Sequence, residues 1–133
     1  MKLFTQNRND EDFMILAMTL AAAADGIDNL EEKAIFNLID QLPRLRKLDT
    51  KEVLEASMNF IIETGYQKSV EYFSNVTDIH LKNAILVLVL EVSMANQDIS
   101  EDEEDIMVHF ADIMGVSNDD LNKIIDVISW KFI

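Results

Sequence analysis

The apolar run AILVLVL occupies residues 84–90, inside a longer segment without Gly or Pro that covers about 78–96. Such a run fits either a buried strand or a helix that is buried on all sides. Its flanks have helical spacing and contain no turn residues, so the whole segment is predicted to be one helix. Because this helix is apolar all round, we expect it to lie buried at the centre of the fold.

Six further helices are predicted on either side of this central segment. Their ends carry residues that interrupt or cap helices, namely Pro43, Gly65 and Gly115 after a helix and Asp49 and Ser117 before one. The predicted helices cover about 10–24, 29–42, 50–64, 67–74, 101–114 and 118–130. No segment offers a strand partner, so the sequence predicts an all-α fold, a compact bundle of about seven helices.

The composition excludes several classes of function. At 133 residues, with 49% hydrophobic and 27% charged residues, the chain has the size and proportions of a single globular domain over residues 1–133. Its net charge of −14 predicts no binding to nucleic acid or to an anionic membrane, but allows cations and a basic protein partner. The absence of Cys excludes disulfides, thiolate metal sites and cysteine nucleophiles.

Residues 13–24, FMILAMTLAAAA, have the apolar character of a signal-peptide core. However, the acidic residues 10–12 precede them, where a signal peptide carries positive charge. Their apolar positions also have helical spacing, at Phe13, Leu16, Ala17, Leu20, Ala21 and Ala24. Twelve residues are too few to span a bilayer. We therefore expect a helix of the folded protein and a cytoplasmic location.

The order of segments repeats once along the chain. An apolar helix leads into ADGID at residues 24–28, and a second one leads into ANQDIS at residues 95–100, about 71 residues later. An acidic helix, a short connection and a further helix follow in both cases. One helix pair packs poorly alone, so the sequence predicts two similar halves around one shared core.

The start of each acidic helix has the pattern of a capping box. In the pairs Asp28/Glu31 and Ser100/Glu103, the first side chain can accept a hydrogen bond from a backbone amide of the first turn. The Glu side chain can accept one from the backbone amide of the first residue. Capping does not explain Asp25, because a carboxylate at the end of a helix meets the negative end of its dipole. Either the N–H groups at the start of the next helix or a cation would compensate this charge, and hard cations take oxygen ligands. The predicted metal ligands are Asp25, Asp28, Glu31, Asp98 and Glu103, and the expected cofactor is a divalent cation, calcium or magnesium.

The two motifs together resemble the TerB-like tellurite resistance family. The residues that carry the resemblance are AAADGIDNLEEKAI at 22–35, MANQDISEDEEDI at 94–106 and the closing segment SNDDLNKII at 117–125. The resemblance implies an all-helical, non-enzymatic module of tellurite resistance and stress response, whose clustered acids are linked to divalent cations. The chain departs from the family pattern at Ile27, which follows Gly26 directly, and at Asn96 and Gln97, where the family has Asp and Gly.

No motif of nucleophilic, phosphate or dinucleotide chemistry is present, and His80 and His109 are isolated in the sequence. The leading interpretation is a non-enzymatic acidic helical module that binds a divalent cation, a protein, or both. The alternatives are an interaction scaffold without metal and a carboxylate-based hydrolase, which would need a pocket joining two acids and a His. The apolar end of the chain, with Trp130, Phe132 and Ile133, either folds back or forms a dimer contact, so both monomer and homodimer stay open.

Overall fold

The computed structural model describes the backbone of residues 1–24, 29–95 and 101–130, and side chains within these ranges except at 29–31 and 101–104. The helices are α1 (Asn9–Ala23), α2 (Asn29–Gln41), α3 (Thr50–Thr64), α4 (Tyr66–Glu71) with a 3-10 turn η1 (Tyr72–Asn75), α5 (Ile79–Ser93), α6 (Glu101–Met114) and α7 (Asn118–Ser129). The described ranges contain no strand. The predicted all-α bundle of about seven helices is confirmed.

Cap residues confirm the predicted starts of α3 and α7. The helix predicted over 78–96 ends earlier, at Ser93, and the one predicted over 67–74 is divided into α4 and η1. The side chain of Asp49 accepts from the amide of Glu52 at the start of α3, and Ser117 accepts from the amide of Asp120 at the start of α7. Gly65, at φ 92°, and Gly115, at φ 73°, follow α3 and α6 in a backbone region that favours glycine. The capping boxes at Asp28/Glu31 and Ser100/Glu103 lie outside the described residues and stay predictions.

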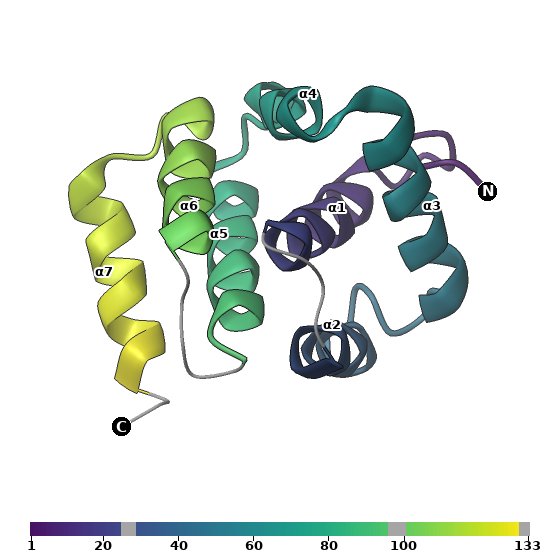
Figure 1. Cartoon of the computed structure of the whole chain (residues 1–133), viewed down its shortest axis with the longest axis horizontal. Coiled ribbons are helices and arrows are strands. Elements are labelled where there is room, and N and C mark those ends of the chain that lie inside the picture. The colour runs from purple at the N-terminus through teal and green to yellow at the C-terminus, as the bar shows by residue number, and fades with distance from the viewer. Residues whose placement is uncertain (25–28, 96–100, 131–133) are drawn as a thin grey trace.

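The helices are arranged around a central pair, α1 and α5, which pack against each other more extensively than any other two elements (Figure 1). Helices α2 and α3 flank α1 on one side, and α6 and α7 flank α5 on the other. Helix α4 and the turn η1 connect the two sides by packing on α3 and on α6. The acidic segments that follow α1 and α5 therefore leave from the two helices at the centre.

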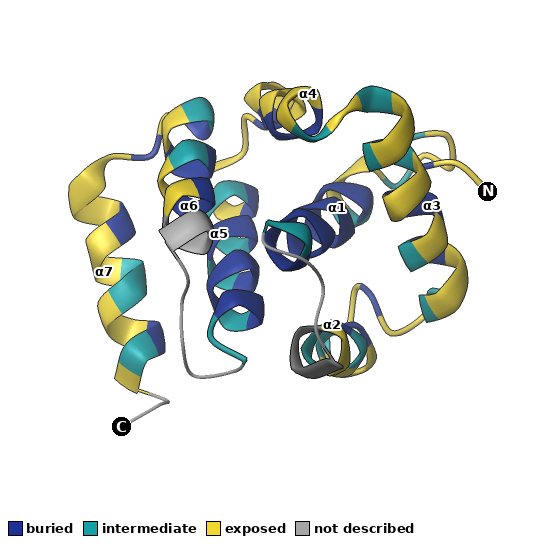
Figure 2. Ribbon diagram, viewed as in Figure 1, coloured by how far each residue is buried: buried dark blue, intermediate teal, exposed yellow. Residues whose placement is uncertain are grey.

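Most of each central helix is buried (Figure 2). The predicted burial of α5 is confirmed, because Ile85, Leu86, Val89 and Leu90 have no exposed surface. Helix α1 is buried more completely, since every residue from 12 to 22 is buried, whereas α5 keeps half-buried residues such as Ala84 and Val87. The apolar stripe predicted for residues 13–24 was therefore too narrow. The core has two central helices, α1 and α5, instead of α5 alone. None of the described helices is both long and apolar enough to cross a membrane.

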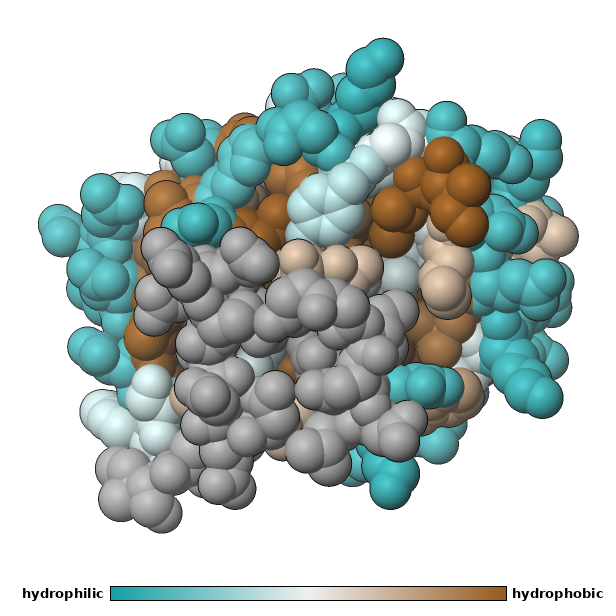
Figure 3. All heavy atoms as spheres, in the orientation of Figure 1, coloured by the Kyte–Doolittle hydropathy of each residue, from teal (hydrophilic) through white to brown (hydrophobic). Residues whose placement is uncertain are grey.

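Some large apolar side chains remain at the surface. Figure 3 shows apolar surface over α3, next to a hydrophilic margin. In the described part of the chain the exposed large apolar residues are Met1, Met58, Ile62, Tyr72, Ile79, Val108, Val127 and Trp130. Trp130 does not fold back onto the core. Most of these residues lie on different helices, but Met58 and Ile62 lie one turn apart on α3.

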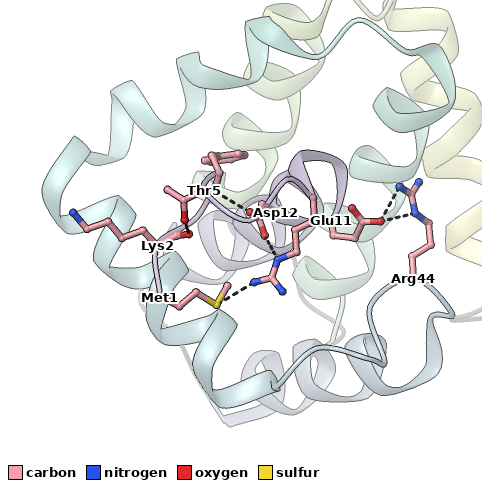
Figure 4. A network of polar contacts seen from close by, with 8 residues as sticks. Met1, Lys2, Thr5, Glu11, Asp12 and Arg44 are labelled. Atoms are coloured by element: carbon pink, nitrogen blue, oxygen red, sulfur yellow. Dashed lines mark hydrogen bonds and ion pairs between the residues drawn. The ribbon is translucent and has the colours of Figure 1, made fainter.

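The segment before α1 is tied to the core by a buried carboxylate. Asp12 has no exposed surface; its Oδ2 accepts from the amide of Phe4 at 2.8 Å, and its Oδ1 accepts from Nε of Arg8 at 3.3 Å. Phe4 has a left-handed backbone, with φ 65°, and its ring packs 4.8 Å from that of Phe13 and 4.9 Å from that of Tyr72. Figure 4 shows the hydrogen bonds at Asp12 that hold the segment before α1 against this helix.

A surface ion-pair cluster joins the loop after α2 to the start of α1 (Figure 4). Arg44 lies 2.8 Å from Glu11 and 3.3 Å from Asp10. The hydrogen bond that Arg44 donates to Glu11 raises the pKa of the guanidinium above its ordinary value. Exposed pairs of this kind contribute only about 0–1 kcal/mol each, so the cluster orients the loop more than it stabilises the fold.

Candidate functional site

The predicted metal ligands lie at the edge of what the structure describes. Asp25, Asp28 and Asp98 fall outside the described residues, as do the side chains of Glu31 and Glu103. The cation site therefore stays a prediction. The described residues next to the two acidic motifs can still be placed, and they show which parts of the fold meet there.

A pocket of about 280 Å³ lies where the end of α1 meets α6. Its described lining comes from three parts of the chain: Ala24 after α1, Tyr66 and Gln67 of α4, and Asp105, Ile106 and His109 of α6. Ala24 immediately precedes Asp25, and Asp105 lies two residues beyond Glu103. The pocket is thus bordered by residues adjacent to both acidic motifs.

Tyr66 connects α4 to the last turn of α1. Gly65 ends α3 with a positive φ, so the chain turns sharply and Tyr66 begins the next helix. Its hydroxyl then donates to the carbonyl oxygen of Leu20 at 3.0 Å. The last four carbonyls of a helix lack intrahelical partners, and such a donor stabilises the end of the helix. Tyr66 therefore helps to fix where α1 ends and where the first acidic motif begins.

Replacing Tyr66 with Phe is expected to lower the free energy of unfolding by about 1 kcal/mol, because the hydroxyl bond to Leu20 is lost while the ring remains. Urea denaturation followed by circular dichroism measures this change. Tyr72→Phe is the matched control, since the Tyr72 ring packs in the aromatic cluster with Phe4 and Phe13. It should shift the unfolding free energy by less than about 0.5 kcal/mol. Equal shifts in the two variants would contradict a specific role for the Tyr66 hydroxyl.

His109 is the half-buried histidine of the pocket. Its Nε2 lies 3.4 Å from the side-chain nitrogen of Gln67, which can donate to it when Nε2 is unprotonated. Asp105 lies one turn earlier on the same helix. His80, in contrast, is exposed in the first turn of α5. The pocket therefore combines one imidazole and one carboxylate beside the two acidic motifs.

The described residues give this pocket little catalytic or metal-binding capacity of their own. The hydrolase hypothesis required two acids and a His in one pocket, and the described lining holds one of each. Within the same ranges, no three His, Asp or Glu side chains lie together in a way that could hold a metal ion. Any cation bound here would need ligands from the two acidic motifs themselves.

The sequence alone does not mark Tyr66, Gln67 or Asp105 as parts of a site, and His109 is isolated in it. No local pattern marks these residues, because α4 and α6 meet only through tertiary packing. Tyr66 and Leu20, for example, are 46 positions apart in the sequence. A tyrosine that directly follows a helix-ending glycine was the only signal, and it does not specify a partner.

Comparison with protein families gives one match. The family model described as "Tellurite resistance protein TerB" matches residues 11–126. This range begins in the first turn of α1 and ends within α7, so it includes both acidic motifs and the pocket between α1 and α6. Comparisons with curated proteins and with solved structures give no match.

Proposed function

Because the chain belongs to the TerB family of tellurite resistance proteins, we propose that it is a non-enzymatic, acidic helical module of the stress response. In this proposal it acts as a single cytoplasmic domain, by binding a divalent cation, a protein, or both. The alternative is a protein-interaction scaffold that uses no metal. The family and the all-α fold are established, and the binding activity is the part that needs a test.

One observation carries the cation-binding part of the proposal. Ala24, next to Asp25, and Asp105, close to Glu103, line the same pocket. The two acidic motifs are about 71 residues apart in the sequence, yet a described residue near each of them lines this one pocket. Carboxylates brought together without bases repel each other, and a divalent cation relieves that repulsion. The pocket therefore supports a shared site for both motifs.

The donor types fit a hard cation. The predicted ligands Asp25, Asp28, Glu31, Asp98 and Glu103 are all carboxylates, and the chain has no Cys that would favour a soft metal. Calcium accepts six to eight oxygen ligands at variable geometry, whereas magnesium requires a stricter octahedron and retains water. When bound, the cation supplies charge neutralisation between the two motifs. The role of this chain's carboxylates is to hold it and to couple the end of α1 to the start of α6.

The non-enzymatic part of the proposal rests on the lack of a reactive group. The sequence has no motif for a nucleophile or a phosphate loop, and no Cys. The pocket at the end of α1 offers Asp105 and His109 but, in its described lining, no Ser or Lys beside them. A binding module needs none of these groups, because its function depends on charge and shape.

The test compares thermal stability with and without saturating Ca²⁺, Mg²⁺, Mn²⁺ or Zn²⁺ in wild type and in Asp25→Asn. A ligand that binds only the folded state stabilises it by mass action, by about 2.7 kcal/mol at 100 times Kd. The cation proposal predicts that one of the ions raises the melting temperature of wild type. Asp25→Asn should remove most of that rise and should stabilise the metal-free protein slightly, because it relieves repulsion with the end of α1.

Two controls separate a ligand from a general loss of charge. Asp40→Asn removes the same charge from an exposed position on α2 and should leave the metal-induced rise unchanged. Ser100→Ala removes a predicted cap; it should lower stability by about 1 kcal/mol with or without metal. If no ion stabilises wild type, the scaffold alternative replaces the cation proposal. If the rise persists in Asp25→Asn, the ion binds elsewhere, and residues 98–105 are the next segment to test.

A further inference from the structure

A second hollow, of about 550 Å³, lies between α2 and α3, away from the acidic motifs' pocket. We call it the α2–α3 groove. Helix α2 forms one wall with Ile35 and Phe36, and helix α3 forms the other with Leu54, Met58 and Ile62. Thr19 of α1 also borders it and is itself fully packed, with its hydroxyl bonded to a carbonyl of its own helix. The groove thus has two helical walls, and the buried Thr19 of α1 forms part of its floor.

Helix α3 has more apolar surface than its packing within the fold uses. Val53, Ala56 and Ser57 are buried and face the core. Leu54, Met58 and Ile62 form a second row at spacings of four residues, which follows one side of the helix. Met58 is 45% exposed and Ile62 is 76% exposed. A surface helix with one packed face normally carries polar residues in such a row, so the row indicates a contact surface.

The shape of the groove suits a helix. Sites that accept an amphipathic helix along its length are apolar grooves. This groove has an apolar row on one wall, a second helix as the opposite wall and a packed residue of α1 in its floor. Such a ligand inserts apolar side chains at i, i+3 or i+4 and i+7, the same repeat that α3 presents. A small polar ligand would leave Leu54 and Met58 in contact with water.

The charge around the groove selects the kind of helix. Glu32 of α2 and Glu55 of α3 line the groove from opposite walls. Lys51 is the basic residue in its described lining. The whole chain carries a net charge of −14. A second copy of the chain would bring the same charge and be repelled, whereas Lys and Arg beside an apolar face would be attracted to both walls.

We propose that the α2–α3 groove binds a basic amphipathic helix of a partner protein, with the apolar row of Leu54, Met58 and Ile62 as its main contact and Glu32 and Glu55 as the charged rim. This inference rests on the protein-binding part of the proposed function and specifies the partner's chemistry. It does not involve the predicted cation ligands. The groove and the cation site can therefore be tested independently.

The test uses a fluorescein-labelled peptide of Leu and Lys, about four helical turns or roughly 14 residues long, with the Leu residues on one helical face. Binding to the full chain is measured by fluorescence anisotropy in EDTA at about 0.15 M salt, where the Debye length is about 8 Å. EDTA removes any cation, so this result stands apart from the metal titration. A scrambled peptide of equal composition retains the charge but lacks the apolar face.

Wild type should bind the amphipathic peptide at least tenfold more tightly than the scrambled one. Ile62→Asn should weaken binding about tenfold, because the apolar contacts of this side chain with the peptide are lost. Its matched control is Val108→Asn, an apolar residue of α6 that is 54% exposed and is not part of the groove's described lining. Affinity should change less than about twofold in the control. Glu55→Gln should weaken binding and reduce its dependence on salt.

Any of three binding results would overturn the proposal. These are no binding of the peptide by wild type, equal binding of the scrambled peptide, and equal losses in Ile62→Asn and Val108→Asn. Sedimentation of the chain alone provides a further check. If wild type dimerises and Ile62→Asn does not, the groove is an interface between two copies and not a site for a basic helix. Because both substituted side chains are exposed, circular dichroism should show unchanged helicity in either variant.

Discussion

Replacing Leu88 with Asp is expected to unfold most of the protein at room temperature. Leu88 lies in α5, is 4% exposed and belongs to the core between α5 and its neighbours. The change removes about 1.5–3 kcal/mol of apolar burial and places a carboxylate where it lacks a partner. Desolvation of a buried charge adds a penalty of several kcal/mol more. The total approaches the roughly 5–15 kcal/mol by which proteins of this kind are stable.

Circular dichroism at 222 nm and a thermal melt measure this effect. The matched control is Ile79→Asp, which introduces the same charge in the same helix at a side chain that is 53% exposed. It should change the unfolding free energy by less than about 1 kcal/mol. A cooperative melt of Leu88→Asp within a few degrees of wild type would show that α5 is not part of the central pair.

Replacing Asp12 with Ala is expected to lower the free energy of unfolding by about 3 kcal/mol. Hydrogen bonds to a charged group contribute about 1.5–3 kcal/mol each, and Asp12 accepts one from the Phe4 amide and one from Arg8. The Arg8 bond counts for less, because that side chain is partly exposed to water. Without Asp12 the Phe4 amide also loses its partner, and the left-handed backbone of Phe4 is no longer held.

The segment before α1, residues 1–8, should therefore separate from the core in this variant. Amide hydrogen exchange at Phe4 should become fast. Exchange in α5 should become faster only to the extent that global stability falls. Asp10→Ala is the matched control, because Asp10 lies in the same turn of α1 but pairs with Arg44 at the surface. Asp10→Ala should lower the free energy of unfolding by less than about 1 kcal/mol. Continued protection of the Phe4 amide in Asp12→Ala would contradict the anchoring role.

The sequence was sufficient to place the helices because their ends are chemically marked. Asp49 and Ser117 cap the helices that they precede, and Gly65 and Gly115 end helices in a conformation that suits glycine. These are local effects, so neighbouring residues contain the information. The buried centre was also predictable at Ala84 to Leu90, where no helical face is polar.

The burial of α1 was predicted incompletely for a physical reason. The apolar positions between Phe13 and Ala24 form a regular stripe, and that stripe suggests a helix with one packed face. Met14, Ile15 and Met18 lie off the stripe and are nevertheless buried, because α5 and the flanking helices cover α1 from several directions. Periodicity indicates the first packed face of a helix but does not show how many neighbours it has.

The sequence suggested a chemistry for the candidate site, which stays a prediction, but it did not indicate the surroundings of the site. The spacing of carboxylates around Asp25 and Asp98 suggested hard-cation ligands, and it could not indicate Tyr66 or His109. Those residues reach the pocket through the packing of α4 on α6 and on α1. The apolar row of α3 illustrates the same limit, because the sequence cannot distinguish a row that packs internally from one that remains at the surface.

The pairing of α1 with α5 also affects how the chain is made. Translation completes α1 at Ala23, and α5 does not begin until Ile79, after α2, α3 and α4 have been synthesised. At roughly 5–20 residues per second, α1 waits several seconds for the helix that covers it. During that time a segment rich in Met, Leu and Ala can pack only on α2, α3 and α4 and lacks its most extensive partner, so it is a suitable ligand for chaperones at the ribosome. Because the decisive contact is so distant in sequence, we also expect slower folding than in bundles whose neighbouring helices pack in order.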